Sequence, residues 1–261
     1  MDETLKRLLK ERFDAPQVYA LVLMGSYARG DAGPFSDIDL VRFVDNVGQT
    51  EPQSYLIEDK LVVVSEVAAE QVEAWFIEPE QAVEVISGLR LAKALVDRDQ
   101  AFEQIQARAQ AFEWDSEMQR KANQWASKQM VGWIEEVHKG FEGLRRNDVG
   151  RLLNSRHGGS WGMTKVMCVQ RGILLSGDNA FFDTLEEVMG AQSDWLYWRR
   201  IAFGVTQASD AGPSLREQVI AGLRLYALTA EMLGDILLPK DKPLVFATVK
   251  RIQNNVSKAA D

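Results

Sequence analysis

The sequence predicts a small mixed α/β domain, an α+β arrangement with a small sheet, followed by an all-α helical bundle. Two observations predict this order. The first 115 or so residues combine short apolar runs with helical patterns, and from about residue 116 only helical spacing remains. A third is the polar stretch GSYARGDAGPFSDIDL, which follows one apolar run and leads into another. A chain of 261 residues has room for both domains, which we expect at residues 1–113 and 114–261.

The first domain carries several short strand patterns. Continuous or alternating apolar runs that end in glycine or polar turns are typical of buried strands. The expected strands are Val18–Met24, Asp37–Val44, Tyr55–Ile57 and Leu61–Val67, with a candidate strand at Ala94–Val96. Helical spacing covers residues 1–13, 68–76 and 80–97. The result is a small sheet flanked by helices.

The second domain shows amphipathic helical spacing. In residues 116–154 the apolar positions recur every three or four residues, which predicts one face of a long helix. This apolar stripe consists of Ala126, Met130, Trp133, Val137, Phe141 and Leu144. Residues 163–175 and 215–238 repeat the pattern, and polar turns such as Ser-Gly-Asp-Asn at 176–179 separate the helices.

Charge and cysteine content narrow the class of protein. A net charge of −8 and a pI near 5.0 argue against a nucleic-acid partner, and suit a cationic substrate. No apolar run reaches the length of a membrane span, so no membrane partner is expected. The single cysteine, Cys168, excludes an internal disulfide and fits a reducing cytoplasm. It lies in an apolar helical run, where we expect a small buried hydrophobic residue.

Two aspartates occur one residue apart at the start of the second predicted strand. On a strand, residues two apart point to the same face, so Asp37 and Asp39 project together while Ile38 and Leu40 face the core. Two neighbouring carboxylates repel each other, and a bound divalent cation removes that cost. Mg²⁺ takes oxygen ligands from one or two carboxylates and from substrate phosphates. The pair therefore predicts a magnesium site for a nucleoside triphosphate.

The Gly25-Ser26 pair lies where the first predicted strand ends. A glycine there allows a sharp turn and close approach of a phosphate, and a short helix beginning at this point would direct backbone N–H groups toward it. The Ser26 hydroxyl adds a donor, and the guanidinium of Arg29, one helical turn on, is within reach of phosphate oxygens.

Together these residues resemble the signature of the polymerase-beta-type nucleotidyltransferase superfamily. The resemblance rests on Gly25-Ser26, Gly30 and the run Ser36–Leu40. It implies that Gly25, Ser26 and Ser36 bind the nucleotide, that Asp37 and Asp39 are catalytic and hold metal, and that two Mg²⁺ ions and ATP take part. The helical domain resembles that of the kanamycin and lincosamide nucleotidyltransferases.

Active members of this superfamily carry a third acidic residue or base, and the sequence offers several candidates. Glu66 on the strand Leu61–Val67 is our first choice, because it is acidic and lies on the strand that the resemblance indicates. Other candidates lie in the adjoining turn and in the helical domain: Glu58, Asp59, Glu135, Glu136, His138 and His157.

The sequence thus predicts a Mg²⁺-dependent enzyme that transfers a nucleoside monophosphate, with AMP from ATP expected, to a hydroxyl of a small molecule. An aminoglycoside or lincosamide is the acceptor implied by the resemblance. Two rivals remain: a protein-modifying nucleotidyltransferase of toxin–antitoxin type, and a nucleotide-binding module without turnover.

Overall fold

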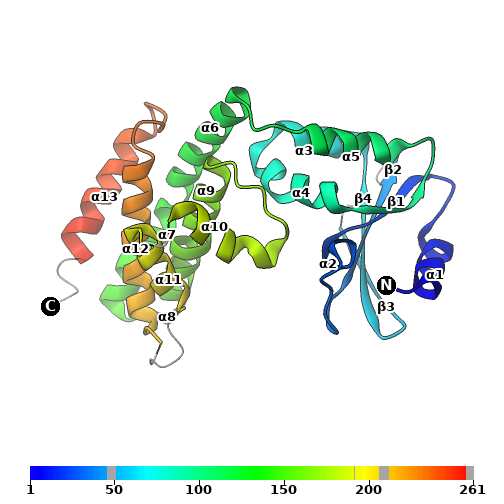
Figure 1. The fold of residues 1–261 in the computed structure, drawn as a ribbon. Helices are drawn as coiled ribbons and strands as arrows, with labels where there is room; N and C mark the ends of the chain where they lie inside the picture. The colour runs from blue at the N-terminus through cyan, green and yellow to red at the C-terminus, as the bar shows by residue number, and fades with distance from the viewer. Residues whose placement is uncertain (46–50, 191, 206–211, 257–261) are drawn as a thin grey trace. The chain divides into compact units, whose positions relative to one another are not determined.

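The computed structural model describes residues 1–45, 51–190, 192–205 and 212–256, and it separates into two compact units (Figure 1). The first unit comprises Met1–Trp114 and Leu174–Ala180, and the second comprises Asp115–Ile173 and Phe181–Asp261. The main break at residue 114 is one residue from the predicted boundary. The segment Leu174–Ala180, which we expected in the helical domain, instead packs with the first unit.

The first unit is built on a small five-stranded sheet with helices around it, as predicted. Its helices are α1 (Glu3–Phe13), α2 (Gly25–Arg29), α3 (Ala69–Ile77), α4 (Pro79–Leu91) and α5 (Ala101–Ala111). Its strands are β1 (Val18–Leu23), β2 (Ile38–Val44), β3 (Gln53–Ile57), β4 (Lys60–Val67) and β5 (Lys93–Asp97). The candidate strand at 94–96 is therefore confirmed, and it ends the helix that we had extended to residue 97.

The strands are ordered β3-β4-β2-β1-β5. Strands β2 and β4 are parallel, whereas the β1–β2, β1–β5 and β3–β4 pairs are antiparallel. The β3–β4 hairpin closes through Glu58 and Asp59, both with positive φ, the backbone conformation that two-residue hairpin turns require.

The two faces of β2 have different neighbours. Ile38 and Leu40 are buried in one apolar cluster with Leu9 and Phe13 of α1. On the opposite face the ring of Phe43 packs against Phe102 of α5, with the ring centroids 5.6 Å apart. Each face is thus covered by helices, and Asp37 and Asp39 belong to the Phe43 face because they are spaced from Phe43 by even numbers of residues.

The second unit consists of helices. They are α6 (Ser116–Gly132), α7 (Ile134–Arg146), α8 (Val149–His157), the π-helix η1 (Gly158–Gly162), α9 (Met163–Gln170), α10 (Phe181–Met189), α11 (Asp194–Phe203), α12 (Leu215–Met232) and α13 (Lys242–Val256). The long helix expected after residue 116 is two helices, because Trp133 leaves the α-helical geometry with ψ near −3°. The apolar stripe continues across this break, so its periodicity did not reveal it.

The middle turns of helix α12 are largely buried. Val219, Leu223 and Tyr226 are almost fully inaccessible, and the Tyr226 hydroxyl donates to the carbonyl of Met130 on α6. Helix α9 ends at Gln170 and not at 175, since Gly172 takes a positive φ of 64° that turns the chain away. This turn precedes the segment that packs with the first unit.

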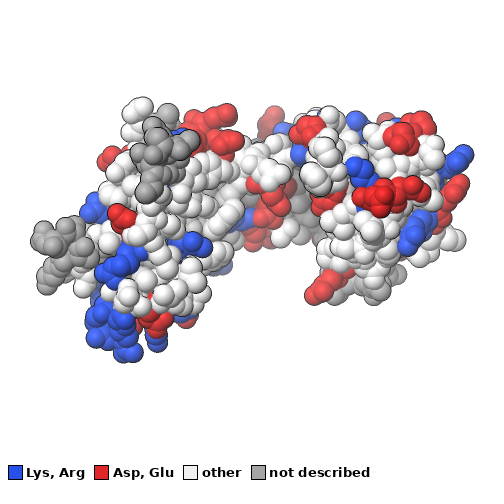
Figure 2. All heavy atoms as spheres, turned by 90° about the horizontal axis from the view of Figure 1, so that it is seen from below, with Lys and Arg blue, Asp and Glu red and all other residues white. Residues whose placement is uncertain are grey.

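Cys168 is fully buried on α9, as expected, and burial raises the pKa of its thiol to about 12. Among the described residues, no helix is both long and apolar enough to cross a membrane. In the view of Figure 2, Lys and Arg side chains on the described surface are interspersed with Asp and Glu side chains, with no broad basic face in that view.

Candidate active site

The site begins where β1 ends beside β2. Leu23 pairs with Leu40, and the backbone N–H of Met24 donates to the carbonyl of Asp39 at 2.9 Å. The antiparallel register therefore sets Gly25 directly against the Asp39 side chain. A Cβ at Gly25 would lie 2.0 Å from Asp39 Oδ2, and the φ of Gly25 is +61°. Both the space and the backbone conformation call for glycine here.

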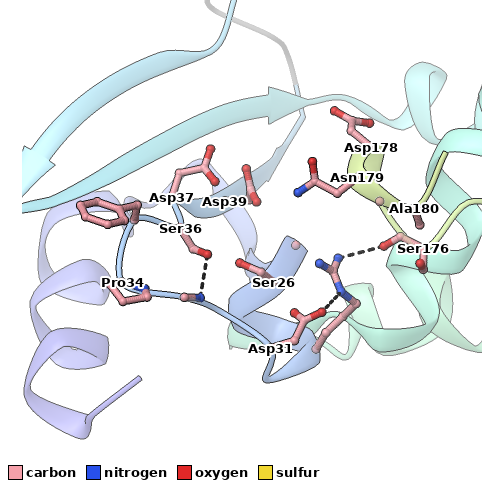
Figure 3. Close-up of a pocket in the computed structure, with 15 residues that line it drawn as sticks. Ser26, Asp31, Pro34, Ser36, Asp37, Asp39, Ser176, Asp178, Asn179 and Ala180 are labelled. Atoms are coloured by element: carbon pink, nitrogen blue, oxygen red, sulfur yellow. Dashed lines mark hydrogen bonds and ion pairs between the residues drawn. The ribbon is translucent and has the colours of Figure 1, made fainter. Parts of the chain in front are cut away.

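Asp37, the residue before β2, and Asp39 within it both line the cavity, and Ile38 between them is buried on the other face. Figure 3 shows the two carboxylates side by side. They line a cavity with a volume of about 730 Å³. That volume lies within the range of ordinary small-molecule sites. The cavity also brings in the other nucleotide-binding residues that we predicted: Gly25, Ser26, Arg29 and Ser36.

The electrostatics of the site fit a cation. Partial burial, followed by the neighbouring charges of Asp37 and Asp178, raises the pKa of the Asp39 carboxyl, and Arg29 offsets this in part. When burial and neighbouring negative charges make ionisation of a carboxyl unfavourable, a bound cation stabilises the ionised form most. Among the described residues, no group of three or more His, Cys, Asp or Glu side chains is placed to hold one metal ion. Two carboxylates still fit Mg²⁺, which commonly completes its shell with water and phosphates.

Arg29 and Ser36 shape the rim of the cavity. Arg29 Nη1 donates to the carbonyl of Ser176 at 2.8 Å, and its Nε donates to Asp31 Oδ2 at 3.2 Å (Figure 3). The Ser36 hydroxyl accepts from the backbone N–H of Gly33 at 2.9 Å, which closes the loop before Asp37. Arg29 is therefore held at the cavity by two partners, and Ser36 fixes the loop that leads into the aspartate pair.

The segment Leu174–Ala180 forms the remaining wall, and we did not predict this. Ser176, Gly177, Asp178, Asn179 and Ala180 all line the cavity. The sequence identifies residues 176–179 only as a polar turn between helices. Nothing in a local pattern says that a turn so far along the chain packs beside the Asp-x-Asp strand, because that contact depends on tertiary structure.

The structure does not bring Glu66 to the cavity, which corrects our first choice of a third acidic residue. In the parallel pairing, Glu66 lies opposite Arg42, three residues beyond Asp39, and the two side chains form an ion pair. Paired residues of neighbouring strands point to the same face, so Glu66 shares the face of Ile38 and Leu40. Asp39 itself is paired with Val63. Strand β4 therefore has an apolar residue where a third carboxylate would stand.

Glu66→Gln is expected to leave nucleotidyl transfer within about twofold of the wild-type rate, because the side chain points away from the cavity. Loss of the half-buried pair with Arg42 should lower the free energy of unfolding by about 1 kcal/mol. Steady-state transfer assays and urea unfolding would measure both quantities. A large loss of transfer with unchanged stability would show that Glu66 has a catalytic role.

The other candidates for a base either lie outside the cavity lining or contact other side chains. Glu58 and Asp59 form the exposed tip of the β3–β4 hairpin and are not among the residues that line the cavity. In the second unit, Glu135 and Glu136 pair with Lys139. His138 contacts Arg251, and the ring of His157 packs against Trp133.

Residues 3–97, which hold the mixed sheet and the glycine turn against Asp37 and Asp39, match the family described as "Nucleotidyltransferase domain". This match lies in the N-terminal part of the chain, as the resemblance does. The structure is similar to the crystal structure of a nucleotidyltransferase-like protein from Exiguobacterium sibiricum 255-15, with a TM-score of 0.51 and 11% identity over 90% of this chain and 78% of that one. At this identity the likeness concerns the fold. No curated protein matches the sequence.

Proposed function

We propose that this protein is a Mg²⁺-dependent nucleotidyltransferase that moves a nucleoside monophosphate, AMP from ATP, to a hydroxyl of a small molecule. The observation that carries the proposal is the Asp37–Asp39 pair, which faces a cavity that Gly25 and Ser26 also line. The match of residues 3–97 to a nucleotidyltransferase domain supports the reaction class.

The predicted site residues that line the cavity have distinct parts in this reaction. Asp37 and Asp39 would hold magnesium, which when bound neutralises charge on the triphosphate and polarises the α-phosphorus. Gly25 leaves room for the Asp39 carboxylate beside the turn, and the Ser26 hydroxyl would donate to the phosphates. Arg29, held at the rim by Asp31 and Ser176, adds positive charge near the phosphate chain. Catalysis then rests mainly on positioning and on stabilised charge.

The acceptor that we propose is an aminoglycoside or a lincosamide. The net charge of −8 supports a cationic acceptor, because an acidic protein raises the local concentration of cations. The support is the family resemblance of the helical domain together with this charge. The same chemistry would serve other small hydroxylated molecules.

A second candidate function, nucleotide binding without turnover, is favoured by one observation. Val63 occupies the position on β4 that pairs with Asp39, so β4 supplies no acidic group at that position. A binding module would retain the phosphate and metal residues and lack the group that activates the acceptor.

The test is transfer from α-³²P-labelled ATP, and from the other three labelled nucleoside triphosphates, with Mg²⁺ and a panel of aminoglycosides and lincosamides. The proposal expects a labelled acceptor, one pyrophosphate released for each transfer, and loss of both with EDTA. Nucleotide binding without pyrophosphate release under every condition would favour the binding module. Label on a protein instead of a small molecule would favour the toxin–antitoxin type of activity.

A further inference from the structure

The reaction proposed above needs a group that takes the proton of the attacking hydroxyl, and this inference rests on that proposed function. Asp37 and Asp39 would direct their oxygens to the metal, so they are poor candidates for this task. Glu66 lies on the opposite face of the sheet, paired with Arg42. Asp31 also lines the cavity but is paired with Arg29, which leaves Asp178 among the acidic residues that line it.

Two hydrogen bonds hold the segment Leu174–Ala180 against the rest of the first unit. The backbone N–H of Leu175 donates to the carbonyl of Val83 on α4 at 2.8 Å, and Arg29 Nη1 donates to the carbonyl of Ser176 at 2.8 Å. A Cβ at Gly177 would lie 3.1 Å from Arg29 Nη1, so the segment runs close beside this guanidinium. These contacts hold its backbone at the cavity.

The next residues form a short 3-10 turn, η2 (Asp178–Ala180), in which the N–H of Ala180 donates to the carbonyl of Gly177 at 3.0 Å. The turn places the side chains of Asp178 and Asn179 at the cavity (Figure 3). Asp178 is solvent-exposed, so a proton that it accepts can pass on to water. Its negative charge acts on Asp39 across the cavity.

The side chains of Asp37, Asp39 and Asp178 do not form one three-ligand metal group in this structure. Within the described part of the chain, no three such side chains are grouped closely enough to hold a metal ion. A general base must come within hydrogen-bond reach of the hydroxyl proton, and Asp178 lines the same cavity as Asp37 and Asp39, where the acceptor would meet the α-phosphorus. Asn179 beside Asp178 carries no charge at neutral pH and cannot replace it.

We infer that Asp178 is the general base of this enzyme, supplied by a turn of the segment that returns to the nucleotidyltransferase domain. The acceptor oxygen forms a bond to the α-phosphorus, and the bond from the α-phosphorus to the bridging oxygen breaks. Pyrophosphate leaves with that electron pair, and the hydroxyl proton goes to the Asp178 carboxylate. No other reactant is consumed.

The test compares wild type, Asp178→Asn and the control Asp183→Asn, an exposed aspartate on α10 that lies outside the residues lining the cavity. One readout is pyrophosphate release with Mg²⁺ and ATP, both with the acceptor panel and with water as the acceptor. The other is the affinity of a nonhydrolysable ATP analogue with Mg²⁺, measured by calorimetry.

For Asp178→Asn we expect kcat to fall by about 10²–10⁴-fold, the usual contribution of a general base. The analogue should bind within about threefold of wild type, or more tightly, because a negative charge is lost near the phosphates. Asp183→Asn should match wild type in both readouts.

Three results would overturn the inference. One is a rate for Asp178→Asn within about fivefold of wild type while Asp39→Asn is inactive; the proposed function then stands without this base. Another is a parallel loss of rate and analogue affinity, which would make Asp178 a binding or structural residue. Finally, a wild-type protein that releases no pyrophosphate with any acceptor or with water would remove the proposed function and this inference with it.

Discussion

Asp39→Asn is expected to lower nucleotidyl transfer by about 10³-fold or more without unfolding the protein, and Asp37→Asn should do the same. Asparagine keeps the shape of the side chain but removes a negative charge from the pair that faces the cavity. Loss of one such electrostatic group commonly costs 10²–10³ in rate, and loss of a metal ligand removes the metal's contribution as well.

The stability of Asp39→Asn should move in the opposite direction from its activity. Burial and the nearby charges of Asp37 and Asp178 raise the pKa of the Asp39 carboxyl above its value in the unfolded chain. The folded state therefore binds that proton more tightly, and ionisation at neutral pH costs stability. Removing the charge should leave the metal-free protein with an equal or higher Tm.

Thermal unfolding with and without Mg²⁺ and an ATP analogue would measure this. Mg²⁺ and the ATP analogue should raise the Tm of the wild type, because ligands that bind only the folded state stabilise it. They should raise the Tm of Asp39→Asn only slightly. Asp99→Asn is the matched control, because it removes an exposed charge at a positive φ that asparagine tolerates. Near-normal transfer by both Asp37→Asn and Asp39→Asn would refute their assignment to the metal.

Gly25→Ala is expected to abolish binding of the magnesium-bound nucleotide. The added Cβ would meet Asp39 Oδ2 at 2.0 Å, so the carboxylate must leave its position. The φ of +61° adds backbone strain of about 1–2 kcal/mol for any residue with a Cβ. The variant should therefore lose about 10²-fold or more in analogue affinity by calorimetry, together with a modest loss of stability.

Gly190→Ala separates these two effects. Gly190 also has a positive φ, +82°, but among the described residues, its chain neighbours aside, no atom lies within 4 Å of the position that its Cβ would take. It should show a similar backbone penalty in urea unfolding and a wild-type affinity for the analogue. If Gly25→Ala bound the analogue within about twofold of wild type, the close packing of Gly25 on Asp39 would have no role in the site.

The predictable part of the site follows from local rules. The two-residue period of a strand is enough to place Asp37 and Asp39 on one face, and the glycine that ends β1 marks the turn beside them. These residues are close in the sequence, so their contact requires only two strands and a short excursion between them. The same local reasoning located all five strands of the sheet within a few residues.

The third acidic residue could not be found in this way. The alternation of side chains along a strand shows that Val62, Val64 and Glu66 share one face of β4. Only the register of β4 on β2 shows that this face points away from the Asp39 side chain. Asp178 lies in an ordinary polar turn, and its position depends on the hydrogen bonds of Leu175 and Ser176 to the first unit. Register and long-range packing are set by the whole fold, and a single sequence does not display them.

The most direct test of the central claim is a crystal structure of the protein with Mn²⁺ and a nonhydrolysable ATP analogue. Anomalous scattering should locate manganese in contact with carboxylate oxygens of both Asp37 and Asp39 and with an oxygen of the triphosphate. Manganese and triphosphate bound at another place, or no anomalous peak beside this pair although the analogue is seen, would contradict the account.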